Sequence, residues 1–424
     1  MQRSRRQVTA VALSALLALA GCGQDEGRRA QPAQSFVDSI GVNVHMGYTD
    51  TAYGRLGAVR AALRQLGVRN VRDGVSIGRE DQYAALRALG RDGVRADLIL
   101  GDPLGRFGTG TVEQQVGTVK RELLSVTRSV EGPNEFDGSG ARDWPRLLRA
   151  YQERLYGLVK GDPELSVLPV VGPSLIDMPA WPRVGDLSRW IDYGNIHPYP
   201  GGEPLQPDRL SVQLEQVARS SRSEPVMATE TGYHNALSAP PVQQPGVSER
   251  AAAAYVPRLF FEHFRAGIER TFEYELVDER PEPAGRDAES HFGLLRSDFS
   301  RKPAFLALAN TIALLEDPGP SFRTGSLDFA LKSGDSVGRL LLQKRDGTFY
   351  LVLWRPGTSA WSRAAHTDLS PAPVAVRVRL GEPAERVRSY APVRSTRPLE
   401  SWEGAESVRL ELGVEPLVLE IRAG

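Results

Sequence analysis

The sequence predicts an α/β chain in two parts, a (β/α)₈ barrel over residues 36–317 and an all-β sandwich over residues 318–424. Two observations predict the barrel: short apolar runs alternate with stretches of helical spacing, and eight such strand–helix units fill roughly 280 residues, the size of this fold. A third observation predicts the sandwich, because after residue 320 apolar residues alternate with period two and no helical stretch occurs.

The expected barrel strands are short apolar runs, and the expected helices carry apolar residues three and four positions apart. Leu56, Val59 and Leu63 show the helical spacing, and Gly67 ends that stretch. Pro145 lies in the first turn of a later helix, where proline is tolerated. The strands are expected at 39–45, 68–74, 94–100, 127–132, 166–171, 191–197, 226–230 and 271–277. The helices are expected at 55–66, 80–89, 111–124, 143–159 and 303–315.

Hairpin and alternation signals define the expected sandwich. The apolar runs 340–343 and 349–354 flank Asp346-Gly347, a dipeptide that favours a tight hairpin turn. Apolar residues then alternate with polar ones at 374–380 and at 408–412. Such alternation is typical of antiparallel strands that bury one face.

The chain begins with a basic segment and a short apolar run at 8–20, and its only cysteine, Cys22, follows that run. This arrangement resembles a bacterial lipoprotein signal over residues 1–22, in which Cys22 becomes the acylated first residue of the mature chain. The resemblance implies export and lipid anchoring to the cell envelope, on the outer face of a bacterial membrane or in the periplasm. An ordinary cleaved signal peptide with a chance cysteine is the alternative. Residues 23–35 are polar and predict a flexible tether.

Charge and cysteine content argue against several classes of protein. The formal net charge is +0, so the chain lacks the positive charge that holds nucleic acid by bulk electrostatics. A single cysteine permits neither an intramolecular disulfide nor a cysteine-based metal cluster. His45, His197 and His234 lack the His-x-His or His-Glu-x-x-His spacing of metal motifs, so we expect no metal and no cofactor. No apolar run after Cys22 is long enough to span a bilayer.

Glutamates follow two of the expected strands: Glu135 comes after the fourth strand, and Glu230 ends the seventh. The carboxyl ends of all strands in a (β/α)₈ barrel meet at one face, so both side chains are expected in one pocket. A pair of carboxylates in such a pocket is suited to cleaving a glycosidic bond. The structural alternative for the first is a plain turn at Pro133-Asn134.

Further polar side chains are expected at the same face. His45 ends the first strand, Arg72 lies in the second, and His197 and Tyr199 end the sixth. Each has a structural alternative, because a histidine at a strand end is often only a hydrogen-bonding partner and an arginine is often at the surface.

The pair Asn134-Glu135 and the stretch around Glu230 resemble the motifs of clan A of the retaining glycoside hydrolases, especially families five and thirty-nine. The resemblance spans residues 38–316, and the tract 293–304 also resembles the stretch that leads into the last barrel helix of such enzymes. It implies that Glu135 is the acid/base and Glu230 the nucleophile.

The same resemblance assigns roles to neighbouring side chains. It implies that Asn134 hydrogen-bonds the 2-hydroxyl of the sugar and that Arg72 keeps Glu230 ionised. It also implies that Tyr199 places its hydroxyl near Glu230, with His197 in the substrate pocket.

One stretch departs from the family pattern. Many clan A members carry a tryptophan at the end of the eighth strand, whereas residues 271–277 contain none. Tyr274 is expected to take its place against the sugar. Trp181 and Trp144, in expected loops above the strands, are expected to stack on sugars.

The resemblance implies a retaining β-glycosidase that acts on a cell-envelope or extracellular polysaccharide, with a carbohydrate substrate and, through Cys22, a membrane as partners. One alternative is a non-catalytic carbohydrate-binding envelope lipoprotein, and another is a structural envelope lipoprotein whose barrel is only a scaffold. The distance between the carboxyl groups separates these possibilities. About 5–5.5 Å indicates retention of configuration, roughly 6.5–9.5 Å indicates inversion, and a greater distance leaves no catalytic pair.

Overall fold

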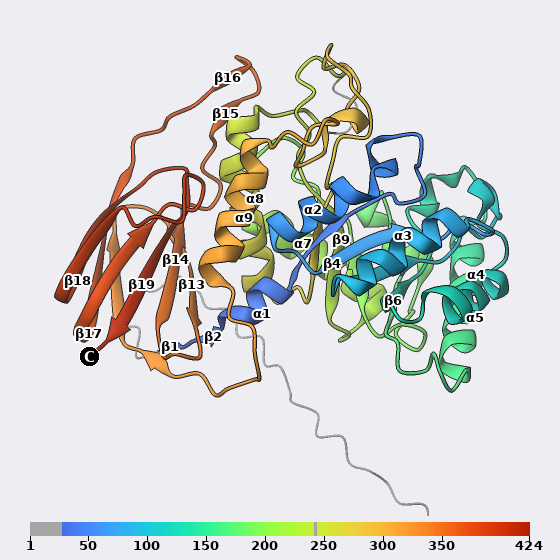
Figure 1. Cartoon of the computed structure of the whole chain (residues 1–424), viewed down its shortest axis with the longest axis horizontal. Helices are drawn as coiled ribbons and strands as arrows, with labels where there is room; N and C mark the ends of the chain where they lie inside the picture. The colour runs from blue at the N-terminus through green and yellow to red at the C-terminus, as the bar shows by residue number, and fades with distance from the viewer. Residues whose placement is uncertain (1–27, 241–243) are drawn as a thin grey trace, which may run out of the picture.

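The computed structural model describes residues 28–240 and 244–424, and within them eight parallel strands form a barrel (Figure 1). The strands are β3 (Ile40–Asn43), β4 (Asn70–Gly74), β5 (Arg95–Ile99), β6 (Thr127–Glu131), β7 (Val170–Val171), β8 (Gly194–Ile196), β9 (Val226–Thr231) and β10 (Thr271–Glu273). They neighbour one another in the order β7-β6-β5-β4-β3-β10-β9-β8. A parallel bridge between Val171 and Tyr193 joins the two edges, so the sheet closes.

One helix precedes the first barrel strand, and the helices that follow the strands cover the outside of the barrel (Figure 1). They are α1 (Ala33–Asp38), α2 (Leu56–Leu66), α3 (Glu80–Arg91), α4 (Val112–Thr118), α5 (Trp144–Gly161), α6 (Trp181–Val184), α7 (Pro207–Ser221), α8 (Glu249–Arg265) and α9 (Pro303–Leu315). A π-helical turn at Val119–Leu123 continues α4. In residues 28–240 and 244–424, no helix combines the length and the apolar character that crossing a bilayer requires.

The predicted fold class is confirmed, and the differences lie in the extent of single elements. The strand predicted at 166–171 is only the two-residue β7, and the strand predicted at 271–277 ends at Glu273. Helices α6, α7 and α8 lie outside the five predicted helices, in segments that the sequence predicts only as connections between strands.

The prediction of a flexible tether is wrong for residues 28–35. In this segment β1 (Arg28–Arg29) pairs with β11 (Ser326–Leu327), and β2 (Gln31–Pro32) pairs with β13 (Gly338–Gln343). The edge of a sheet offers unpaired backbone groups, and these hold a polar segment that has no apolar pattern of its own. Cys22, the predicted acylation site, lies outside the described residues.

The barrel interior has an apolar base and a polar layer nearer the carboxyl ends of the strands. Phe272 packs with Val171 and Met227 at the base. Gly41 makes room for this ring, because a Cβ there would lie 2.4 Å from a ring carbon. The side chains of the polar layer are all buried, and they belong to Asn43, Arg72, Asp97, Ser129, Glu131, Asn195 and Thr229.

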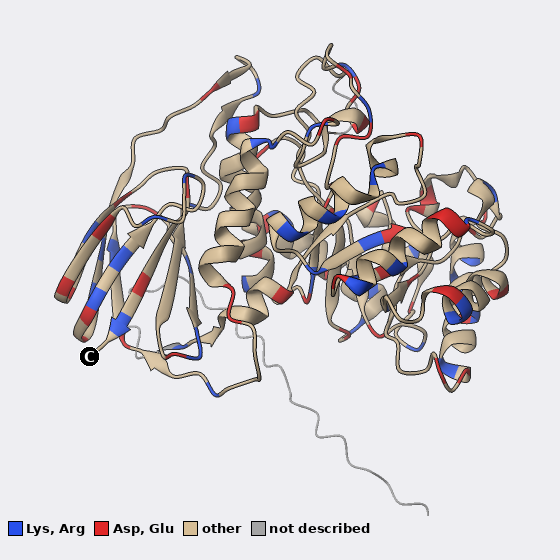
Figure 2. Ribbon diagram, viewed as in Figure 1, with Lys and Arg blue, Asp and Glu red and all other residues tan. Residues whose placement is uncertain are grey.

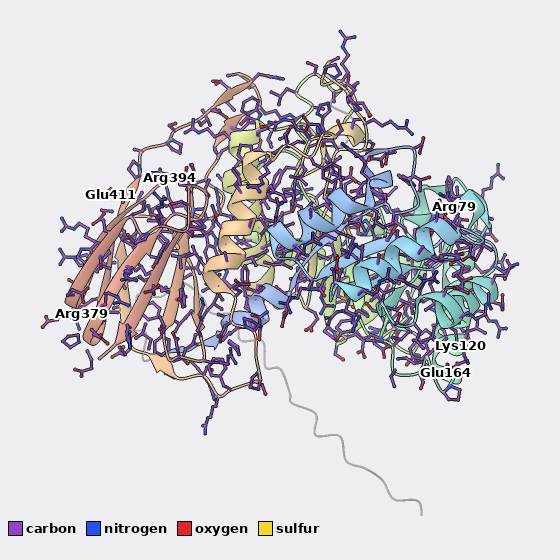
Figure 3. The ribbon with its side chains drawn as sticks, in the orientation of Figure 1. Arg79, Lys120, Glu164, Arg379, Arg394 and Glu411 are labelled. Carbon is purple, nitrogen blue, oxygen red and sulfur yellow. The ribbon has the colours of Figure 1, made fainter. Side chains whose placement is uncertain are left out.

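The C-terminal part is an antiparallel sheet folded around a second core. Besides β13 it contains β12 (Phe329–Ser333), β14 (Phe349–Trp354), β17 (Val374–Tyr390), β18 (Glu400–Leu412) and β19 (Leu417–Ala423). The long β17 pairs with β12 through its first half and with β19 through its second half, so it belongs to both layers. Figure 3 shows Arg379 and Glu411 at the periphery of this sandwich, where both side chains are exposed. A separate hairpin pairs β15 (Trp361–Ser362) with β16 (Thr367–Asp368).

Helices α8 and α9 lie between the barrel and the sandwich, and α9 carries no charged residue (Figures 1 and 2). The ring of Phe261 stacks on that of Trp354 with centroids 5.6 Å apart. The buried Arg258 donates hydrogen bonds to the carbonyl oxygens of Arg355 at 2.6 Å and Thr358 at 2.8 Å. The inner layer of the sandwich therefore belongs to the same core as the barrel, whereas its outer layer packs on the second core.

Candidate active site

A cavity of about 760 Å³ opens at the carboxyl ends of the barrel strands. This is the face where the fold class places the functional groups. The cavity lining includes most of the residues that the sequence predicts for the site, namely His45, Arg72, Asn134, Glu135, Tyr199, Glu230 and Tyr274. The predicted residue His197 is buried and contacts Glu135.

The two predicted glutamates lie together in this cavity. A carboxylate oxygen of Glu135 lies within 4.8 Å of a carboxylate oxygen of Glu230. Glu230 belongs to β9, whereas Glu135 follows β6 in a left-handed conformation with φ 44°. The backbone N–H of Glu135 donates to Oγ of the buried Ser174 at 3.1 Å, which fixes this turn. With this turn the Glu135 side chain lies in the cavity beside Glu230.

Glu230 is held in its ionised form. Arg72 Nη1 donates to Glu230 Oε1 at 2.6 Å, and the hydroxyl of Tyr199 donates to Oε2 at 2.9 Å. Burial alone would raise the pKa of Glu230, but the positive charges of His197 and Arg72, together with these hydrogen bonds, lower it below its ordinary value. The side chain therefore carries the negative charge that a nucleophile needs.

The position of Arg72 depends on Glu131, a functional residue that the sequence did not identify. Arg72 Nε donates to Glu131 Oε2 at 2.8 Å, Nη2 donates to Oε1 at 2.7 Å, and Nη1 also reaches Asn43 Oδ1 at 3.0 Å. This is a buried, bidentate ion pair, and such pairs fix geometry as well as charge. The period-two pattern of β6 indicates that Ser129 and Glu131 share a face, but it does not say what they meet.

Asn134 lies at the edge of the site with one end of its amide fixed. Its Oδ1 accepts a hydrogen bond from Arg72 Nη2 at 2.7 Å. The rest of the side chain is exposed, and among the described residues Nδ2 has no hydrogen-bond partner. An amide N–H₂ group beside both carboxylates is thus free to donate to a bound molecule.

His197 and Glu135 share a proton. Thr229 donates its hydroxyl hydrogen to Asn195 Oδ1 at 2.8 Å, so it accepts the Nε2 hydrogen of His197 at 3.0 Å. His197 Nδ1 lies 2.8 Å from Glu135 Oε1, and because a carboxylate can only accept, this contact requires a proton on one of the two atoms. Burial lowers the pKa of His197, but the Glu230 charge and the hydrogen bond to Glu135 outweigh it and raise that pKa above its ordinary value.

Aromatic rings form one wall of the cavity. His45 stacks on Tyr48 with ring centroids 4.8 Å apart, and it contacts the edge of Tyr274 at 5.6 Å. Tyr274 follows β10 directly, where the sequence predicts the replacement of a tryptophan, and it also packs against Tyr199 and Phe292. This wall supplies an apolar surface beside the carboxylate pair.

Two tryptophans do not take part in the cavity as expected. The prediction that Trp181 stacks on sugars is wrong, because Trp181 begins the short helix α6, which packs on α7, and only 1% of its surface is exposed. Trp144 is also buried, under the guanidinium of Arg183. His234 has a structural role, since its Nε2 donates to the carbonyl of Gln244 at 2.7 Å.

Two clusters of the described residues bring donor atoms close enough to hold a cation, Glu135 with His197 and Glu230, and His45 with Glu275 and Glu279. In the first cluster the Arg72 guanidinium already lies 2.6 Å from Glu230 and compensates its charge. In the second, His45 Nε2 forms an ion pair with Glu275 at 3.3 Å. Both clusters are thus occupied by the protein's own cations.

No protein-family model and no curated protein matches the sequence. The fold matches solved glycoside hydrolases. A family 39 glycoside hydrolase from Bacteroides cellulosilyticus WH2 has a TM-score of 0.62 and 18% identity, over 92% of this chain and 81% of that one. The GH39 enzyme from Xanthomonas axonopodis pv. citri has a TM-score of 0.59 and 15% identity, over 93% of this chain and 96% of that one. A monomeric beta-xylosidase from Caulobacter crescentus CB15 has a TM-score of 0.59 and 17% identity, over 93% of this chain and 98% of that one. The resemblance to family 39 is therefore confirmed at the level of the fold, barrel and sandwich together.

Proposed function

We propose that this protein is a retaining β-glycosidase, with Glu230 as the nucleophile and Glu135 as the acid/base. The separation of the two carboxylates carries the proposal. Oxygens within 4.8 Å fit the spacing of about 5–5.5 Å between the carboxyl groups of retaining enzymes. An inverting enzyme needs about 6.5–9.5 Å, to leave room for a water between carboxylate and sugar. The fold shared with family 39 enzymes supports the same reaction class.

In the first step an oxygen of Glu230 attacks the anomeric carbon of the sugar. Glu135 gives its proton to the glycosidic oxygen, the bond between that oxygen and the anomeric carbon breaks, and the leaving group departs as an alcohol. Sugar and Glu230 are then joined by an ester bond. Arg72 and Tyr199 keep Glu230 ionised for the attack, and Asn134 Nδ2 donates to the 2-hydroxyl, an interaction that strengthens in the transition state.

In the second step the roles of the carboxyls change. The esterified Glu230 has no charge, so Glu135 is stable as a carboxylate and takes a proton from water. The water oxygen bonds to the anomeric carbon as the ester bond breaks, which restores Glu230. The proton between His197 Nδ1 and Glu135 Oε1 stays there in both steps and holds the side chain in place, while the proton that Glu135 gives and takes is carried by its other oxygen.

The biological context is also a proposal. The basic and apolar start of the chain and the position of Cys22 support export and lipid anchoring at the cell envelope. The substrate that we propose is a β-linked envelope or extracellular polysaccharide. Because one protein of the same fold is named a beta-xylosidase, β-xylosides are the first substrates to test.

The test is hydrolysis of 4-nitrophenyl β-glycosides of several sugars, with the first-formed sugar anomer identified by NMR. The proposal predicts that the wild-type protein releases the β-anomer first and that Glu230→Gln is inactive. Release of the α-anomer would show inversion. A wild-type protein that binds glycans but cleaves none would favour the alternative, a carbohydrate-binding envelope protein.

A further inference from the structure

Phe107 is an exposed aromatic residue at the mouth of the active-site cavity, and the proposed catalytic steps do not use it. It lies in the loop between β5 and α4, and its side chain lines the cavity. Its exposed fraction is 81%, the largest among the exposed large hydrophobic residues of the described chain. A phenylalanine in this position gains little from burial in the folded protein.

The backbone of Phe107 makes its exposure harder to explain by stability alone. Phe107 has φ 59° and ψ 23°, a left-handed conformation that a residue with a Cβ adopts only when its surroundings hold it there. Gly105 and Gly108, on either side, are also left-handed, but they carry no side chain that is strained by it. The loop therefore keeps an unfavourable conformation that presents an aromatic ring to the cavity, and such features cluster at ligand sites.

Arg106 fixes the ring relative to the acid/base. Its Nε donates to the buried Asp102 at 2.8 Å. Its guanidinium carbon lies 5.2 Å from the ring centroid of Phe107 and 5.7 Å from that of Phe136. Phe136 follows Glu135 in the chain, so the Arg106 guanidinium contacts both the exposed ring of Phe107 and the turn that carries the acid/base.

We propose that Phe107 is the stacking platform for the sugar on the leaving-group side of the scissile bond. The inference rests on the proposed function, because Glu135 must contact the leaving oxygen and Phe107 is tied to the Glu135 side of the cavity. The ring offers an apolar face to the C–H face of a pyranose, and Arg106 offers donors to its hydroxyls. The substrate class is thereby narrowed to glycosides whose leaving group is itself a sugar.

The test compares two substrates that differ only in the leaving group. For xylose, glucose and galactose, the full-length protein is assayed on the β-glycosyl fluoride and on the β-1,3- and β-1,4-linked disaccharides. Phe107→Ala is expected to lower kcat/KM on the cleaved disaccharide about 3- to 10-fold, the worth of one aromatic stacking contact, mainly through KM. It is expected to leave hydrolysis of the fluoride, which has no leaving sugar, unchanged.

Matched variants separate binding from folding. Phe107→Trp should retain activity on the disaccharide, and Leu104→Ala, an exposed apolar residue of the same loop outside the cavity lining, should change neither substrate. Phe107→Gly should behave as Phe107→Ala in kinetics while Tm stays at the wild-type value, because relief of the left-handed strain offsets the added freedom of the unfolded chain.

Each failure has its own signature. The role of Phe107 would be overturned if Phe107→Ala lowered kcat/KM equally on fluoride and disaccharide, or on neither. It would also be overturned if the wild-type enzyme cleaved fluorides but no disaccharide. A wild-type protein that cleaves neither kind of substrate would instead overturn the proposed function.

Discussion

Arg72 Nη1 lies 2.6 Å from Glu230 Oε1, while Nε and Nη2 of the same guanidinium bind the carboxylate of Glu131. Arg72 is 2% exposed and Glu131 is fully buried, so neither side chain can turn away without leaving a charge unpaired in the barrel. The charge state of the proposed nucleophile is thus set by an ion pair inside the barrel.

We predict that Arg72→Lys lowers kcat/KM about 10²–10³-fold, the usual cost of losing a preorganised electrostatic contact. Lysine has a single ammonium group in place of the planar guanidinium with its several N–H donors, so it cannot bind Glu131 and Glu230 together. The acid limb of the pH–rate profile should move to higher pH, since Glu230 loses the close guanidinium contact that lowers its pKa. Arg60→Lys, on the outer face of α2, is the control. An acid limb that stays in place would contradict this account.

The environment of His45 predicts how stability depends on pH. Burial would lower the pKa of His45, but the Glu275 carboxylate, with Asp73 and Glu279 farther away, raises it from 6.5 to about 9. The folded state therefore keeps this proton after the unfolded chain has released it. The contribution of His45 is fully present below pH 6.5 and is lost as the pH rises through 9, and it amounts to at most about 3 kcal/mol.

Urea unfolding between pH 6 and 9.5 measures this contribution. The free energy of unfolding should fall over this interval in the wild type, and His45→Gln should remove most of the fall. His366→Asn, at an exposed histidine of the β15–β16 hairpin, should leave it unchanged. Burial also raises the pKa of Asp73, to about 7, which adds a decrease of the same sign below neutral pH. A stability that rises from pH 6.5 to 9.5 would contradict the assignment.

Arg258 predicts that barrel and sandwich unfold together. Its guanidinium is buried and serves the carbonyl oxygens of Arg355 and Thr358, which Arg258→Met would leave unpaired. We predict a loss of about 3 kcal/mol in the free energy of unfolding and a single urea transition for both parts. Arg250→Met, on the same helix but 60% exposed, should cost less than about 0.5 kcal/mol. Two separate transitions in the wild type would exclude a shared core.

The sequence predicts where a residue lies in the structure when the strand–helix repeat determines its place. Glu135, Glu230 and Arg72 lie at or near strand ends, and the barrel brings all strand ends to one face, so their meeting followed from the fold. The ion pair between Arg72 and Glu131, separated by 59 residues, did not follow. Alternation tells which side of a strand faces the axis, but it does not tell which facing side chains meet.

The wrong predictions concern segments without hydrophobic periodicity. Trp181 was expected in an open loop, but the segment forms the helix α6 and its indole joins the core, a choice made by tertiary packing and not by local pattern. The polar composition of residues 28–35 predicts a flexible segment, yet 28–32 pair with β11 and β13 through backbone hydrogen bonds and Ala33 begins α1. Likewise, no sequence pattern predicts the left-handed backbone of Phe107.

Azide rescue of Glu135→Ala tests most directly whether Glu135 and Glu230 have the roles proposed. The variant should lose about 10²–10⁴-fold on a glycoside with a poor leaving group, the usual worth of general acid–base catalysis. On a 2,4-dinitrophenyl β-glycoside the first step needs no acid, so the glycosyl-enzyme should accumulate. Added azide needs no base, so it should restore turnover and give the β-glycosyl azide. No rescue, or the α-glycosyl azide as product, would contradict the assignment.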